Sequence, residues 1–102
     1  MQIFEVRISL AAYSDMAQLR VFLKEMLSLE GAVRYANNMR EEIKMLSVYA
    51  ECNGLSTSQT LRKIHPKARR IMSHNRKWLY VYHIEDSFVI VDRIIPAKMN
   101  KG

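Results

Sequence analysis

The sequence predicts an α+β domain in which a hairpin of two helices packs on one face of an antiparallel sheet. Three observations support this fold class. The chain begins with an alternating segment, continues with two segments of helical periodicity, and ends with runs rich in aromatic and β-branched residues. The predicted order of elements is therefore strand, helix, helix, strand, strand, strand.

The first predicted element is a strand over residues 2–10. Its apolar residues, from Phe4 to Leu10, occupy every second position, and polar residues lie between them. This alternation is typical of a strand with one buried face and one exposed face.

Two helices follow in the prediction. Ser14 and Asp15 offer an N-cap, and apolar residues then recur at steps of three and four from Met16 to Leu27. Gly31 predicts a stop or hinge. A second helical pattern covers residues 32–50 and ends at the turn 52–54. Because the connection is so short, the two helices should lie antiparallel as a hairpin.

Three strands are predicted after the polar stretch 55–60. They cover residues 69–73, 77–85 and 88–95, with a turn at Asp86-Ser87 and an end at Pro96. Trp78, Tyr80 and Tyr82 alternate and should share a face; we interpret this face as the core that receives the helices, in preference to a platform for nucleic-acid bases.

On this interpretation Leu79, Val81 and His83 lie on the other face of the sheet, which is expected to be free. The register of His83 against Arg93 depends on the length of the turn, and the sequence leaves it open.

Length and composition predict one domain over residues 1–102. The chain is 49% apolar and 25% charged, as in ordinary globular domains, and has no apolar run long enough to cross a membrane. Without a secretory signal, a cytoplasmic location is expected. The single cysteine allows no disulfide, and the three histidines lack neighbours at metal-ligand spacing. No metal or cofactor is therefore expected.

The net charge of +6 belongs to the second half of the chain. Residues 1–50 carry six basic and six acidic residues, whereas residues 51–102 carry ten basic and four acidic ones. Such asymmetry indicates a polyanionic or acidic partner that meets the second half.

Most of this excess lies in residues 62–77, which contain no acidic residue. The cationic residues of this basic segment are Arg62, Lys63, Lys67, Arg69, Arg70, Arg76 and Lys77, accompanied by His65 and His74. Uncompensated cations at this density repel one another, which favours a surface for phosphates or an acidic partner over a merely solvated edge.

The order of elements and the run from Arg76 to Ile95 resemble the RelE/ParE superfamily of bacterial toxins. That run has a basic start, a Tyr-bearing strand, an acidic turn and an apolar strand that leads to Arg93. The resemblance implies a toxin of a type II toxin–antitoxin pair, neutralised by a cognate antitoxin protein and present as a homodimer or a toxin–antitoxin hetero-oligomer.

The resemblance implies two alternative activities. In one branch the toxin enters the ribosome and cleaves messenger RNA as a metal-independent endoribonuclease, and in the other it inhibits DNA gyrase without catalysis. A third alternative is a degenerate relative that only binds nucleic acid or protein. The candidate catalytic residues are Arg70, His74, His83, Arg93 and Lys98. The arginines and the lysine would hold phosphate charge and a histidine would move the proton.

Arg70 matches a basic residue of the family's preceding strand, and Lys98 matches a basic residue after its last strand. The chain departs from the ribonuclease pattern at Leu79, where those enzymes have an arginine, at Pro96, and in having no tyrosine after Lys98. The choice between messenger RNA and gyrase therefore stays open at the level of sequence.

Overall fold

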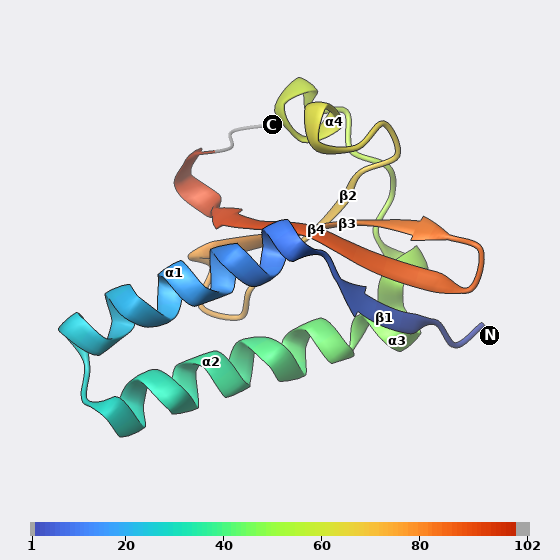
Figure 1. Cartoon of the computed structure of the whole chain (residues 1–102). Coiled ribbons are helices and arrows are strands. Elements are labelled where there is room, and N and C mark those ends of the chain that lie inside the picture. The colour runs from blue at the N-terminus through green and yellow to red at the C-terminus, as the bar shows by residue number, and fades with distance from the viewer. Residues whose placement is uncertain (1, 100–102) are drawn as a thin grey trace.

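The computed structural model describes residues 2–99 (Figure 1). Its elements are β1 (Glu5–Ile8), α1 (Leu10–Met26), α2 (Leu29–Lys44), α3 (Leu46–Tyr49), the 3-10 helix η1 (Ala50–Cys52), α4 (Gln59–Ile64), β2 (Arg69–Met72), β3 (Trp78–Glu85), β4 (Phe88–Pro96) and the 3-10 helix η2 (Ala97–Met99). The α+β class and the predicted succession of strands and main helices are confirmed.

The four strands form one sheet in the order β1-β4-β3-β2. β3 is antiparallel to both β2 and β4, as expected, but β1 pairs parallel to β4, so the sheet is mixed. A hairpin turn sets the direction of neighbouring strands, whereas β1 and β4 are joined through most of the chain. The direction of β1 therefore had no local signal in the sequence.

The boundaries of α1 and α2 differ from the prediction. Ser9 is the N-cap of α1, because its hydroxyl accepts the Ala12 N–H at 3.0 Å, so the predicted cap at Ser14-Asp15 is wrong. The helices are separated at Leu27 and Ser28, and Ser28 caps α2 by accepting the Gly31 N–H. Gly31 therefore lies inside the first turn of α2 and is not the predicted stop.

The second predicted helix is interrupted at Met45. Its amide approaches the carbonyls of both Glu41 and Glu42, and α3 and η1 continue the chain in a new direction. A backbone hydrogen bond from Phe4 to Ser47, 2.8 Å long, holds α3 beside β1. This bend brings the end of the helical segment to the sheet.

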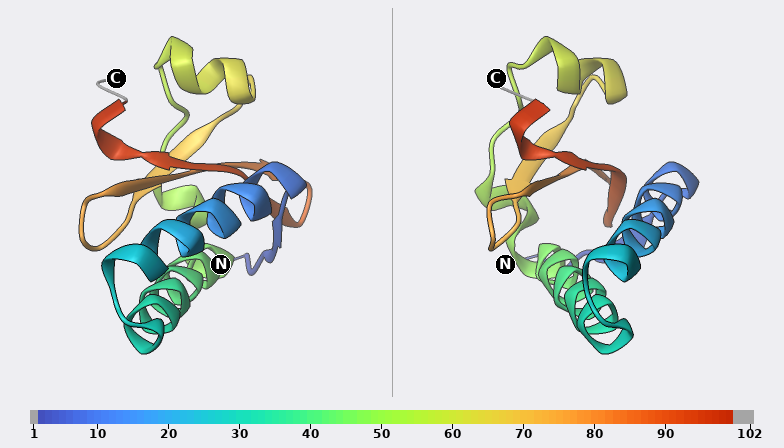
Figure 2. Two further views of the ribbon diagram at one scale, coloured as in Figure 1. Left: turned by 60° about the vertical axis from the view of Figure 1, so that its left-hand side comes forward. Right: turned by 90° about the vertical axis from the view of Figure 1, so that its left-hand side faces the viewer.

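The main core lies between the hairpin of α1 and α2 and one face of the sheet (Figure 2). Tyr80 and Tyr82 are fully buried there, and Trp78 packs against the same cluster. The interpretation of this aromatic stripe as core is confirmed. The turn between β3 and β4 has two residues, since Glu85 pairs with Phe88.

Helix α4 lies on the other face of the sheet (Figures 1 and 2). Ser58 caps it by accepting the Leu61 N–H, and Leu61 then packs on Ala68 and on Val81 of β3 in a second apolar cluster. The expectation of a free face is therefore wrong over part of the sheet, because the stretch read as polar loop contains a short amphipathic helix.

Candidate functional site

The structure brings two of the candidate catalytic residues into one row across the sheet. Arg70 of β2 and Arg93 of β4 both pair with Val81 of β3. Directly opposed residues share a face, and two strand spacings separate the outer strands by roughly 10 Å. Arg70 and Arg93 thus flank Val81 on the face that α4 covers.

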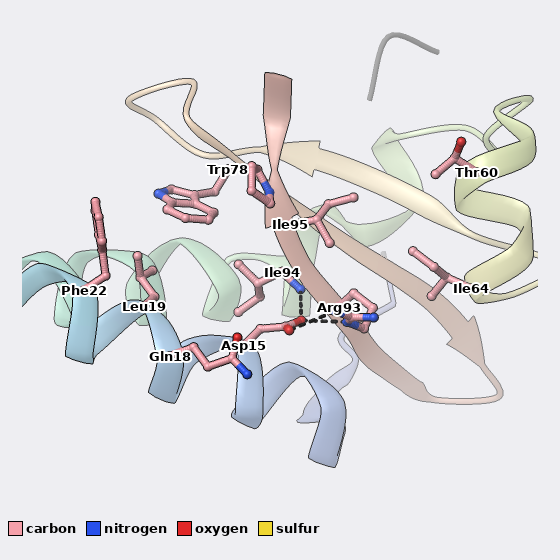
Figure 3. A pocket seen from close by; sticks show the side chains of 11 residues that line it. Asp15, Gln18, Leu19, Phe22, Thr60, Ile64, Trp78, Arg93, Ile94 and Ile95 are labelled. Atoms are coloured by element: carbon pink, nitrogen blue, oxygen red, sulfur yellow. Dashed lines mark hydrogen bonds and ion pairs between the residues drawn. The ribbon is translucent and has the colours of Figure 1, made fainter. Parts of the chain in front are cut away.

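Arg93 is engaged by α1. Its Nε and one terminal nitrogen donate to the two carboxylate oxygens of Asp15 at 2.8 and 3.0 Å, and the Ile94 N–H donates to the same carboxylate at 2.9 Å (Figure 3). The hydrogen bonds that its guanidinium donates to Asp15 raise the pKa of Arg93. A bidentate pair of this kind fixes both side chains. Arg93 therefore joins β4 to α1 and is not a free phosphate ligand.

His83 is buried and already has partners. Its Nδ1 lies 2.6 Å from the Asp92 carboxylate, and its ring stacks on that of His65 with 3.6 Å between centroids. Val81 pairs with Arg93 and Tyr82 with Val91, so Asp92 is the extra residue of a β-bulge. With a two-residue turn, His83 pairs with Ile90, which answers the open question of register against Arg93.

His74 lies at the turn between β2 and β3. Its backbone N–H donates to Glu42 of α2 at 2.8 Å, while its imidazole is almost wholly exposed. The side-chain hydroxyl of Tyr35 accepts hydrogen bonds from Asn75 and from the indole of Trp78. This network holds the turn against α2, on the hairpin side of the sheet and away from His83.

The exposed cations of the basic segment form two groups. Arg62, Lys63 and Lys67 are exposed on α4 and the turn after it, whereas Arg76 and Lys77 are exposed at the β2–β3 turn. Lys98 joins the second group, because the Ala97 N–H donates to the Lys77 carbonyl at 2.9 Å.

Arg69 belongs to neither group, since its guanidinium donates to the Asn53 carbonyl at 2.6 Å. The guanidinium therefore closes the loop after η1 onto the edge strand β2. Arg69 is a structural residue in this arrangement, although it lies within the basic segment.

A groove lies along the unpaired half of β4 (Figure 3). β1 pairs only with Phe88–Val91, so the edge beyond Val91 is open between α1 and α4. The groove has a volume of about 570 Å³ and is mainly apolar. It is lined by Asp15, Gln18, Leu19, Phe22, Thr60, Ile64, Trp78, Arg93, Ile94, Ile95 and Pro96.

Sequence reasoning missed this groove because two of its causes are tertiary. α4 was not predicted, and the short pairing of β1 is invisible in the alternation of residues 2–10. One signal was available. α1 contains more large apolar residues than its buried stripe uses, and Phe22 is one of those that remain exposed.

Within residues 2–99, no group of three or more histidine, cysteine, aspartate or glutamate side chains is arranged to hold a metal ion. In the same range, no helix is long and apolar enough to span a membrane.

No sequence model of a known protein family matches the chain, and no curated protein matches it. A chain in a solved structure of the chromosomal ParDE toxin–antitoxin system from P. aeruginosa is similar in fold. The TM-score is 0.78 at 14% identity, and the similarity covers 92% of this chain and 96% of that chain. This protein therefore has the fold of a ParDE toxin–antitoxin component, the fold that its resemblance to the RelE/ParE superfamily implied.

Proposed function

We propose that this chain is the toxin of a type II toxin–antitoxin pair, acting in the cytoplasm and held inactive by a cognate antitoxin. The proposal is supported by the fold that it shares, over nearly its whole length, with a protein of a ParDE system. The basic excess of its second half also suits an acidic partner.

Of the two activities that the resemblance implies, we infer inhibition of a protein target, with DNA gyrase as the candidate. The observation that carries this choice is the engagement of the candidate catalytic groups. The guanidinium of Arg93 is paired with the Asp15 carboxylate, and the ring of His83 stacks against the ring of His65. Cleavage of RNA requires donors aimed in advance at the phosphate, and removal of one such donor typically costs about 100-fold to 1,000-fold in rate.

Leu79 supports the same choice. It stands where the ribonucleases of the superfamily have an arginine, and it is buried on the face away from the hairpin. Arg70, His74 and Lys98 remain as uncommitted candidates, but they lie at the edge strand, at the β2–β3 turn and after β4. Ribosome-dependent cleavage of messenger RNA is therefore the second candidate.

The antitoxin is proposed to occupy the groove along β4. Addition of a strand to this edge is blocked, because the Ile94 N–H is already bound by Asp15 and Pro96 has no N–H. An occupant must therefore use side chains. Apolar anchors would fill the space between Phe22 and Ile64. Acidic residues would meet Lys63, which is next to Ile64 in the chain, and Lys98, which follows Pro96 by two residues.

The two mechanisms are separated by paired assays with the full chain. Purified protein is added to gyrase in a supercoiling assay, and transcript 5′ ends are mapped in cells after induction. We expect supercoiling to be blocked and no new 5′ ends to arise within translated codons. The opposite pair of results would replace gyrase by messenger RNA as the target.

A matched pair of variants makes the mapping of transcript 5′ ends more specific. If cleavage occurs through the uncommitted residues, Lys98→Ala should reduce it by about 100-fold or more, and Lys24→Ala on the exposed face of α1 should leave it unchanged. Under the gyrase proposal neither variant creates new 5′ ends.

A further inference from the structure

We propose that α4 is a detachable cover of the sheet face opposite the helical hairpin, latched by stacking of His65 on His83 and released when both rings are protonated. This device does not depend on which target the protein inhibits, but α4 contributes Thr60 and Ile64 to the groove along β4, so its release would also remove one wall of that groove.

The attachment of α4 to the sheet is small. Three residues, Leu61, Ala68 and Val81, form its buried cluster, with Ile64 and Ile95 packed beside them, whereas fifteen buried residues form the main core. A helix of six residues is not stable by itself in water, so its position depends on these contacts. Release of α4 would therefore expose only the small second apolar cluster and leave the main core in place.

The histidine stack closes the C-terminal end of this cover. His65 is the C-cap of α4, and its ring lies parallel to that of His83 within 4°, at 3.6 Å between centroids. His83 belongs to β3 and is held in place by Asp92, whose carboxylate the β-bulge of β4 directs toward Nδ1. The stack thus joins the end of a short helix with few buried contacts to a central strand of the sheet.

The hydrogen bonds indicate which charge states the closed stack accepts. Nδ1 of His65 accepts the Lys67 N–H at 3.0 Å, and this hydrogen bond requires a lone pair on that nitrogen. His83 can carry a proton beside the Asp92 carboxylate. A second proton, on His65, breaks the bond to Lys67 and places two cationic rings face to face.

Few other charges can offset this repulsion. The carboxylates nearest His83 are Glu85 of β3 and Asp92 of β4, and the cations of the adjoining elements are Arg62, Lys63 and Lys67 of α4 and its following turn and Arg70 of β2. The Glu85 carboxylate is 3.7 Å from Nε2 of His83 and largely exposed, so solvent screens it. Arg70 adds positive charge. Double protonation therefore favours the open arrangement.

Release would uncover Val81, which lies between Arg70 and the ion-paired Arg93 in the row across the sheet. Val81 is fully buried in the closed form, and its exposure would create an apolar strip between two cationic side chains. The exposure of this face of the sheet would then depend on pH, in the range in which imidazoles titrate.

The test is amide hydrogen exchange of the full chain at about pH 7.5 and about pH 5, on either side of the ordinary imidazole range. After correction for intrinsic exchange, protection of the Arg62 and His65 amides, which bond to Ser58 and Leu61, should fall about tenfold or more at the lower pH. The Ala32 amide of α2 should keep its protection. Equal protection of α4 at both pH values, or loss in α2 as well, would overturn the proposal.

Two variants isolate the stack. His65→Phe retains an aromatic ring that cannot be charged, so α4 should stay protected at both pH values. His74→Phe, at the exposed β2–β3 turn, should behave like the unaltered chain. A His65→Phe variant that loses protection on acidification, or that lacks it already at neutral pH, would show that the charge on His65 is not the release mechanism.

Discussion

At the scale of single residues, Asp15 does not have the helix-capping role that its sequence context indicates. Ser14 and Asp15, followed by Gln18, fit the pattern of a capping box. In the structure the carboxylate of Asp15 instead binds Arg93 and the Ile94 amide. Ser9 caps α1, and nothing in the local pattern distinguishes these two starts.

The cap assignment gives the first prediction. Ser9→Ala should lower the free energy of unfolding by about 1 kcal/mol, because the Ala12 N–H loses its acceptor. Ser14→Ala, an exposed position inside α1, should change it by less than about 0.5 kcal/mol. Urea unfolding of both variants measures the difference. A larger loss for Ser14→Ala would restore the cap that the sequence indicated.

The buried tyrosines give a prediction at alkaline pH. Burial raises the pKa of Tyr82, whose hydroxyl donates to the Ala50 carbonyl at 2.6 Å, and burial together with the hydrogen bond to Glu42 raises the pKa of Tyr80. A folded-state pKa above the unfolded value of about 10 means that this stabilisation is complete below pH 10 and is lost as the pH rises further.

The free energy of unfolding should therefore fall progressively above about pH 10. Tyr82→Phe should make this fall less steep, whatever its effect at neutral pH, because one proton-linked group is removed. Denaturant unfolding at a series of pH values gives the slope. An identical slope in Tyr82→Phe would mean that Tyr82 does not contribute to the linkage.

At the scale of elements, sequence patterns succeeded where stabilisation is local. The strands β3 and β4 and their Asp86-Ser87 turn were predicted because aromatic and β-branched runs flank a two-residue turn. Helix α4 was missed because six residues show less than two turns of periodicity and depend on Val81. The parallel direction of β1 was missed because its partner is remote in the chain.

The groove between these elements gives a prediction for the antitoxin. Phe22→Glu places a charge in the apolar lining and should weaken antitoxin binding by at least about tenfold, since burial of an unpaired charge is costly. Val21→Glu alters an exposed apolar residue of α1 that does not line the groove. It should bind normally. Calorimetric titration of both variants, checked for folding, makes the comparison, and equal weakening would place the antitoxin elsewhere on α1.

At the scale of the whole molecule, the sequence predicted the sign of the surface charge but not its distribution. The segment 62–77 is continuous along the chain, yet α4 lies on one face of the sheet and the turn at His74 contacts α2 on the other side. Of the five candidate catalytic residues, only Arg70 and Arg93 share a row. Spacing along the chain could not show that Asp15 and His65 would engage two of them.

The exposed cations and the open groove are the features on which the proposed binding to other proteins rests. The toxin role is proposed from these features together with the shared fold. The proposed antitoxin groove and the α4 cover share Thr60 and Ile64, whereas the choice of target is independent of both.

The most direct test of the central claim is growth of bacterial cells after induction of the unaltered chain. We expect rapid arrest, and we expect growth to resume when the protein encoded by the neighbouring reading frame is produced as well. Soluble, folded protein should be verified in the same cultures. Normal growth despite its accumulation, matching cells with an empty vector, would contradict the toxin assignment.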